Sequence, residues 1–212
     1  VAEDVLAEGC ADMVSMARPF LADPMLVAKA ASGQSGLITP CIACNQACLD
    51  HTFGGKLSSC LVNPRACHET ELVVAPAAIP AKIAVVGAGP AGLSAALTAA
   101  ERGHHVTLFD KATSIGGQLN MAKQVPGKEE FWGLVDYYGA SVAAAGISLR
   151  LGEAATPEGL EGFDHIVIAT GVKPRNPEIP GQDLPHVLSY IDVLQDKAPV
   201  GQRVAIIGAG GI

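Results

Sequence analysis

The sequence predicts an α/β fold built on a doubly wound parallel sheet. The first observation is an apolar run, Ile83–Val86, followed by a glycine-rich turn, a helical pattern and a second apolar run that ends at Asp110. The second is the return of the glycine turn at Gly208, again after an apolar run. The third is composition: 24 glycines and only 4% aromatic residues suit tightly packed layers of helices and strands.

Composition and charge exclude several classes of protein. The 212 residues carry 14 Lys plus Arg and 21 Asp plus Glu, a formal charge of −7, and contain no basic run, so we expect no nucleic-acid partner. The apolar stretch Ile83–Ala100 is long enough to span a bilayer, but glycines and a proline interrupt it, so we expect no membrane association. Four of the six cysteines lie close together, which favours a metal site in a reducing, cytoplasmic compartment over disulfides.

The amino-terminal residues alternate between helical and extended patterns. Val1–Glu8 has the pattern of a helix end, and Ala11–Met16 that of a buried strand. We expect a loop at Ala17–Pro19. Asp23 is a good N-cap for a helix over Pro24–Ala31, because a proline is favoured at the first helical position.

The middle of the chain, residues 33–80, has little periodicity and contains the four clustered cysteines. It ends in a Pro/Ala-rich linker, Ala75–Pro80, which marks a domain boundary. The remaining elements are expected in this order: strand Ile83–Val86, helix Pro90–Arg102, strand Val106–Phe109, helix Lys128–Ala145, strand Ile166–Ala169, a short helix Ser189–Leu194 and a strand Val204–Ile207.

The first glycine turn has the pattern of a dinucleotide site. Its residues are Gly87, Ala88, Gly89, Pro90, Ala91 and Gly92. Gly87 allows the sharp turn, Gly89 lets the backbone approach a pyrophosphate, and Gly92 lets the helix pack closely on the strand. The helix N–H groups and dipole would then face the phosphates. Asp110, with Lys111 beside it, ends the second strand, where an acid binds ribose hydroxyls. The alternative is a tight turn with no ligand.

Three further segments extend this pattern. The first is the glycine pair Gly116–Gly117, which is followed by Gln118. The second, after an expected strand, consists of Ala169, Thr170 and Gly171. Each alone could be a simple loop or strand end. Placed after the first turn, both resemble loops of two-dinucleotide flavoproteins, a family of FAD and NAD(P)H enzymes. Gly208 and Gly210 then belong to a second nucleotide-binding unit.

The cysteines Cys41, Cys44, Cys48 and Cys60 have the spacing C-x2-C-x3-C-x11-C. Cys44 and Cys48 are four residues apart and could share a helical face. Four thiolates fit either zinc or a [4Fe–4S] cluster. The cluster is favoured, because zinc ribbons usually have two C-x-x-C pairs and this chain has one. Unligated buried cysteines are the remaining alternative.

A family resemblance lies in these same segments. The stretches Cys41–Asp50 and Ser59–His68 closely resemble bacterial NADPH-dependent 2,4-dienoyl-CoA reductases, which belong with old yellow enzyme and trimethylamine dehydrogenase. The stretch Asp12–Pro24 is similar to the last strand and helix of that family's FMN-binding (β/α)8 barrel. The resemblance implies that Ala17 and Arg18 bind the FMN phosphate; the other reading of Arg18 is a surface ion pair.

The resemblance implies an internal segment of a longer enzyme, divided as follows: a barrel tail (1–32), an iron–sulfur segment and linker (33–80), the first part of an FAD-binding domain (81–198) and the start of an NADPH-binding module (199–212). It also implies that electrons pass from NADPH through FAD and the [4Fe–4S] cluster to FMN, which reduces an unsaturated acyl-CoA. No residue of this chain is assigned a catalytic role.

Two other functions fit the motifs. One is an electron-transfer module similar to the small subunit of glutamate synthase, with no substrate of its own. The other is a zinc-stapled nucleotide-binding domain without redox chemistry. The barrel-like stretch Asp12–Pro24 favours the reductase.

Overall fold

A computed structural model describes residues 2–208. Its centre is a sheet of four parallel strands in the order β3-β2-β1-β4. The strands are β1 (Lys82–Val86), β2 (His105–Asp110), β3 (Ser148–Leu151) and β4 (His165–Ile168). Val85 of β1 pairs with Leu108 on one side and Val167 on the other. The predicted α/β class with a parallel sheet is confirmed, and β3 is the strand that the apolar pattern missed.

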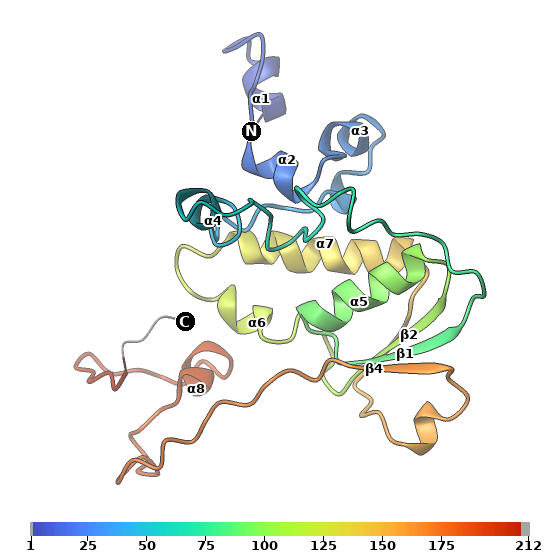
Figure 1. The fold of residues 1–212 in the computed structure, drawn as a ribbon. Coiled ribbons are helices and arrows are strands. Elements are labelled where there is room, and N and C mark those ends of the chain that lie inside the picture. The colour runs from blue at the N-terminus through green and yellow to red at the C-terminus, as the bar shows by residue number, and fades with distance from the viewer. Residues whose placement is uncertain (1, 209–212) are drawn as a thin grey trace.

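Two helices, α5 (Pro90–Glu101) and α7 (Glu130–Ala144), cover one face of this sheet (Figure 1). The layer between helices and strands is built mainly from aliphatic side chains. Its largest fully buried side chains are Leu93, Leu108, Val85 and Val142. This core holds the carboxyl end of β1 and the amino end of α5 in a fixed relation.

The amino-terminal part contains three short helices, α1 (Ala2–Ala7), α2 (Arg18–Ala22) and α3 (Leu26–Ala31). The expected strand Ala11–Met16 is wrong, because no strand of the described chain pairs with it and Met13 is 82% exposed. A β-strand needs the backbone of a neighbour to satisfy its N–H and C=O groups.

Two further boundaries in this part differ from the prediction. The loop expected at residues 17–19 is instead the start of α2, whose second residue is Pro19; a helix tolerates proline in its first turn. Helix α3 begins at Leu26 rather than Pro24. The Asp23 carboxylate still accepts a hydrogen bond from the backbone N–H of Met25 at 2.9 Å.

The segment that follows is irregular, with only η1 (Ser35–Leu37) and α4 (Leu49–Phe53). It runs across α7 on the side away from the sheet (Figure 1). Its anchor is Ile42, 7% exposed, which joins the same buried cluster as Leu134 and Tyr138 of α7. The segment between the first two clustered cysteines is therefore packed directly onto the α/β core.

The carboxyl-terminal part extends away from the sheet (Figure 1). Its one described helix is α8 (Tyr190–Leu194). Two other short helices lie earlier in the chain: α6 (Leu119–Ala122) before α7, and η2 (Glu158–Leu160) between β3 and β4. The expected strand Val204–Ile207 is wrong: Ile206 is 85% exposed, and no described strand lies beside it to complete a ladder. Among residues 2–208 no helix is long and apolar enough to cross a membrane, and the run Ile83–Ala100 is divided between β1 and α5.

Candidate functional site

The glycine loops predicted to bind a dinucleotide meet at one edge of the sheet. Parallel strands place their carboxyl ends together, so the loops after β1, β2 and β4 share that edge. The chain moves outward from β1 to β2 and β3, then returns to β4 on the other side of β1. Such a reversal in strand order is where open α/β sheets bind ligands.

The three glycines of the first turn occupy different surroundings. Gly87 has φ +112°, and a Cβ on it would collide with the carbonyl oxygen of Ala169. A Cβ on Gly92 would collide with the carbonyl oxygen of Gly87. A Cβ on Gly89 would meet no atom within 4 Å. Two glycines therefore allow the strand and helix to pack, and the third faces open space in front of the N-terminus of α5.

The second glycine pair is packed against this turn. The Gly116 N–H donates to the Ala88 carbonyl at 2.8 Å, and a Cβ on Gly117 would lie 2.9 Å from the Cα of Gly89. The Gln118 side chain donates to the carbonyl of Val172 at 3.1 Å, so it reaches the loop that begins at Ala169. The structure thus brings together three loops that are far apart in the sequence.

Asp110 holds the first turn in place. One carboxylate oxygen accepts from the Ala88 N–H at 2.6 Å, and the other from the Ala112 N–H at 2.8 Å. A carboxylate oxygen has a second lone pair, so these bonds leave acceptor capacity for a ribose hydroxyl. Lys111 and Thr170, also predicted to bind the cofactor, are exposed at the same edge.

The second glycine turn is described only at its start. Gly208 has φ +100°, the left-handed conformation that a sharp glycine turn uses. Gly210 lies outside the described residues. The nucleotide role of both residues stays a prediction.

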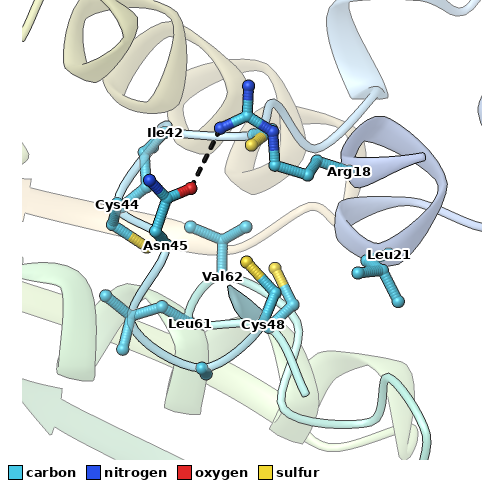
Figure 2. A pocket seen from close by; sticks show the side chains of 11 residues that line it. Arg18, Leu21, Ile42, Cys44, Asn45, Cys48, Leu61 and Val62 are labelled. Carbon is cyan, nitrogen blue, oxygen red and sulfur yellow. Dashed lines mark hydrogen bonds between the residues drawn. The ribbon is translucent and has the colours of Figure 1, made fainter. Parts of the chain in front are cut away.

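The four clustered cysteines line a single pocket, 22 to 41 residues before the start of β1 at Lys82. They are Cys41, Cys44, Cys48 and Cys60. The apolar side chains of Ile42, Leu61 and Val62 line the same pocket, and Val62 projects between Cys44 and Cys48 (Figure 2). Burial raises the pKa of the Cys60 thiol, and the charges of Cys41 and Cys44 raise it further, whereas backbone hydrogen bonds act in the opposite direction. The thiols are thus near enough to influence one another.

The cysteine segment has a tight, irregular backbone. Ala43 and Asn45 have φ of +53° and +59°, a conformation that residues with a Cβ rarely adopt. The Ala43 N–H donates to the Cys41 sulfur at 3.4 Å. The helical face predicted for Cys44 and Cys48 is wrong, because α4 begins only at Leu49. A turn rather than a helix sets the directions of these thiols.

Helix α2 and its C-cap are bonded to three parts of the cysteine segment. Arg18 donates to the Asn45 side-chain oxygen at 3.1 Å, between Cys44 and Cys48 in sequence. The Leu21 carbonyl accepts from the Asn63 side chain at 2.9 Å, just after Cys60.

The third bond comes from the C-cap of α2. The buried Asp23 carboxylate, 3% exposed, accepts from the Thr39 N–H at 2.9 Å and from the Lys29 ammonium at 2.6 Å. Thr39 lies just before Cys41 in sequence. Segments on both sides of the cysteines are therefore fixed to one short helix.

The donor chemistry fits a thiolate-bound group. Four sulfurs and one guanidinium face a cavity with apolar walls, and thiolates are the ligands of iron–sulfur clusters. Across residues 2–208, no three His, Cys, Asp or Glu side chains are arranged to hold a metal ion. The fit rests on the shared cavity, and the identity of the group is part of the proposal below.

Ala17 is the N-cap of α2, and Arg18 is its first residue. The described partner of Arg18 is the amide oxygen of Asn45, and not the carboxylate that a surface ion pair would require. Binding of an FMN phosphate by Ala17 and Arg18 stays a prediction.

Comparison with known proteins identifies the family of the α/β part. Residues 81–212 match the family model described as pyridine nucleotide-disulphide oxidoreductase. The chain belongs to this family. Its parallel sheet and glycine turns are accordingly those of an FAD/NAD(P)-binding domain.

Two curated relatives match almost the whole chain. A metal reductase of Desulforamulus reducens is 44% identical over 100% of this chain and 33% of its own length. A bilirubin reductase of Mediterraneibacter gnavus is 36% identical over 99% of this chain and 33% of its own length. The chain thus spans about a third of the relatives it matches. The relatives are flavin-dependent oxidoreductases of the old-yellow-enzyme and trimethylamine-dehydrogenase type, as the sequence resemblance predicted.

A solved structure agrees with this assignment. The complex of 2-naphthoyl-CoA reductase with 2-naphthoyl-CoA superposes with a TM-score of 0.91 at 40% identity, covering 94% of this chain and 31% of that chain. The fold similarity therefore includes the irregular cysteine segment as well as the sheet.

Proposed function

We propose that this chain is a segment of an NADPH-dependent enoyl- or dienoyl-CoA reductase that holds FAD, a [4Fe–4S] cluster and part of an FMN site. When bound, these groups would carry electrons from the nicotinamide to an unsaturated acyl-CoA. The observation that carries the proposal is the shared packing of the two sites. Ile42, between Cys41 and Cys44, belongs to the same buried cluster as Val85 and Leu93 on either side of the glycine turn.

The residues at the sheet edge where the glycine loops meet have distinct roles in this function. Gly87 and Gly92 keep strand and helix in contact, and Gly89 leaves space for a pyrophosphate at the N-terminus of α5. Asp110 fixes the turn through Ala88 and keeps lone pairs for a ribose. The remaining residues proposed to contact the nucleotides are Pro90, Ala91, Lys111, Gly117, Gln118, Ala169, Thr170, Gly171, Gly208 and Gly210.

The cysteines and the side chains around them would bind the cluster. The four thiolates would ligate the cluster, and Ile42, which is buried, and Val62 would cover part of it with apolar surface. A reductase acting on an acyl-CoA is supported by the 2-naphthoyl-CoA reductase complex, whose substrate is a conjugated acyl-CoA. The dienoyl substrate and the preference for NADPH rest on the sequence resemblance.

The test begins with the protein purified without air. We expect iron and acid-labile sulfide in a ratio near one, about four of each per chain, together with extractable FAD. Zinc in place of iron would overturn the cluster assignment. Consumption of NADPH and NADH with dienoyl-CoA and aryl-CoA substrates in the full-length enzyme would then separate the substrate classes.

A matched pair of cysteine variants localises the group. Cys44→Ser should remove most of the iron, because Cys44 lines the cavity. Cys10→Ser should keep it, because Cys10 is exposed in the amino-terminal part of the chain. Equal iron loss in both variants would mean that the group is bound elsewhere or that oxidation alone destroys it.

A further inference from the structure

Among the described residues that line the cysteine cavity, Arg18 carries the only charge other than that of the thiols themselves. Figure 2 shows its side chain reaching from α2 to Asn45, across the pocket that Cys44 and Cys48 line. A guanidinium is always protonated at physiological pH, so its positive charge is permanent. The cavity therefore places one fixed cation beside four cysteine side chains.

Asn45 determines where this cation lies. Its side-chain oxygen accepts from a guanidinium nitrogen of Arg18 at 3.1 Å. Asn45 has φ +59°, a conformation that Asn tolerates better than most residues. The turn between Cys44 and Cys48 thus presents an acceptor toward α2, and the hydrogen bond restricts an otherwise flexible side chain.

We propose that Arg18 is a positioning residue of the cysteine site that raises the reduction potential of the group held there. The inference rests on the proposed iron–sulfur function and extends it. Reduction adds one negative charge to a cluster already surrounded by thiolates. A nearby cation stabilises the reduced form more than the oxidised form, and because Arg18 is exposed to solvent the effect should be partly screened. Removing the cation should shift the potential to more negative values.

The experiment compares variants of the holoprotein purified without air, by redox titration followed through the cluster's electron paramagnetic resonance signal. Arg18→Gln should retain most of its iron and titrate at a more negative potential. Arg18→Lys keeps the charge and should recover most of the shift. Asn45→Gly keeps the left-handed backbone but releases Arg18, and we expect an intermediate shift. Arg150→Gln, on the exposed surface of β3, is the control and should leave the potential unchanged.

The outcomes separate this inference from the proposed function. Wild-type protein without iron would overturn both. Wild-type protein with iron, but equal potentials in all four variants, would overturn the role of Arg18 alone. Loss of FMN from Arg18→Gln with an unchanged cluster potential would assign Arg18 to the flavin phosphate instead and overturn the proposal. Equal iron loss in Arg18→Gln and Arg18→Lys, with no change in the potential of the remaining cluster, would indicate a merely structural contact.

Discussion

At the residue scale, the glycine turn separates packing from ligand binding. Gly92 has no room for a Cβ, because the carbonyl oxygen of Gly87 occupies that position. Gly92→Ala should therefore destabilise the protein by about 1–3 kcal/mol, as in other overpacked sites. Thermal unfolding of the variant and the wild type measures the loss, and an unchanged midpoint would contradict the close approach of helix and strand.

Gly89 differs from Gly92, because its position has room for a side chain. A side chain here meets no protein atom within 4 Å, and φ is −77°, so Gly89→Val should fold with nearly wild-type stability. The same side chain would fill the space that a pyrophosphate needs, so bound FAD should fall to near zero. Flavin content per chain after gel filtration is the measurement. Full flavin retention in a folded Gly89→Val protein would argue against this turn as the FAD site.

The sequence predicted these glycines from the strand–turn–helix pattern that surrounds them. It predicted Asp110 from its place at the end of the second strand, and the four cysteines from their spacing. It could not predict the partners that depend on tertiary contacts. The hydrogen bond between Arg18 and Asn45 joins residues 27 positions apart, and no periodic pattern in the sequence indicates it. The direction of the Arg18 side chain was for the same reason not foreseeable from its motif.

At the element scale, the strands and helices of the core followed their hydrophobic patterns, and the isolated apolar runs did not. β1, α5 and α7 bury a face, so the pattern and the fold agree. Ala11–Met16 and Val204–Ile207 have strand-like composition without a described neighbouring strand. β3 was not predicted although Leu149 and Leu151 alternate with polar residues, because the strand is only four residues long and its side chains are largely exposed.

Helix α8 gives a pH-dependent prediction. Its capping box joins Ser189 and Asp192 in both directions, and hydrogen bonds from the Ser189 backbone and side chain lower the pKa of the Asp192 carboxyl. A carboxyl whose pKa is lower in the folded state stabilises that state above the unfolded pKa, and this contribution is lost as the pH falls through the folded pKa. α8 should therefore fray in acid, below the ordinary Asp range.

The measurement is the titration of the Asp192 carboxyl by NMR. Ser189→Ala removes the hydroxyl whose hydrogen bond helps to lower the pKa of the Asp192 carboxyl, so this pKa should move up toward its ordinary value. Asp183, exposed in the preceding connection, provides the reference carboxyl in the same spectra. An identical Asp192 titration in the variant and the wild type would contradict the capping box.

At the scale of the whole molecule, the described chain leaves both edges of its sheet unpaired, at β3 and at β4, and the β4 edge is the apolar one. β4 pairs with β1 on one side, and no described strand lies on the other. Ile166 and Ile168 of β4 are 47% and 67% exposed, and Val172 beyond them is 78% exposed. An apolar strand with unpaired backbone groups is a template for further pairing.

The isolated 212-residue polypeptide should therefore self-associate through this edge. Ile168→Lys places a charge there and should reduce association, because a buried lysine would oppose strand pairing. Met13→Lys, at a residue that is 82% exposed in the amino-terminal part, changes surface polarity and net charge equally without touching the sheet. Light scattering across a concentration series compares the three proteins. Association that falls equally in both variants would attribute the effect to net charge, and only a selective loss in Ile168→Lys identifies β4 as the pairing edge.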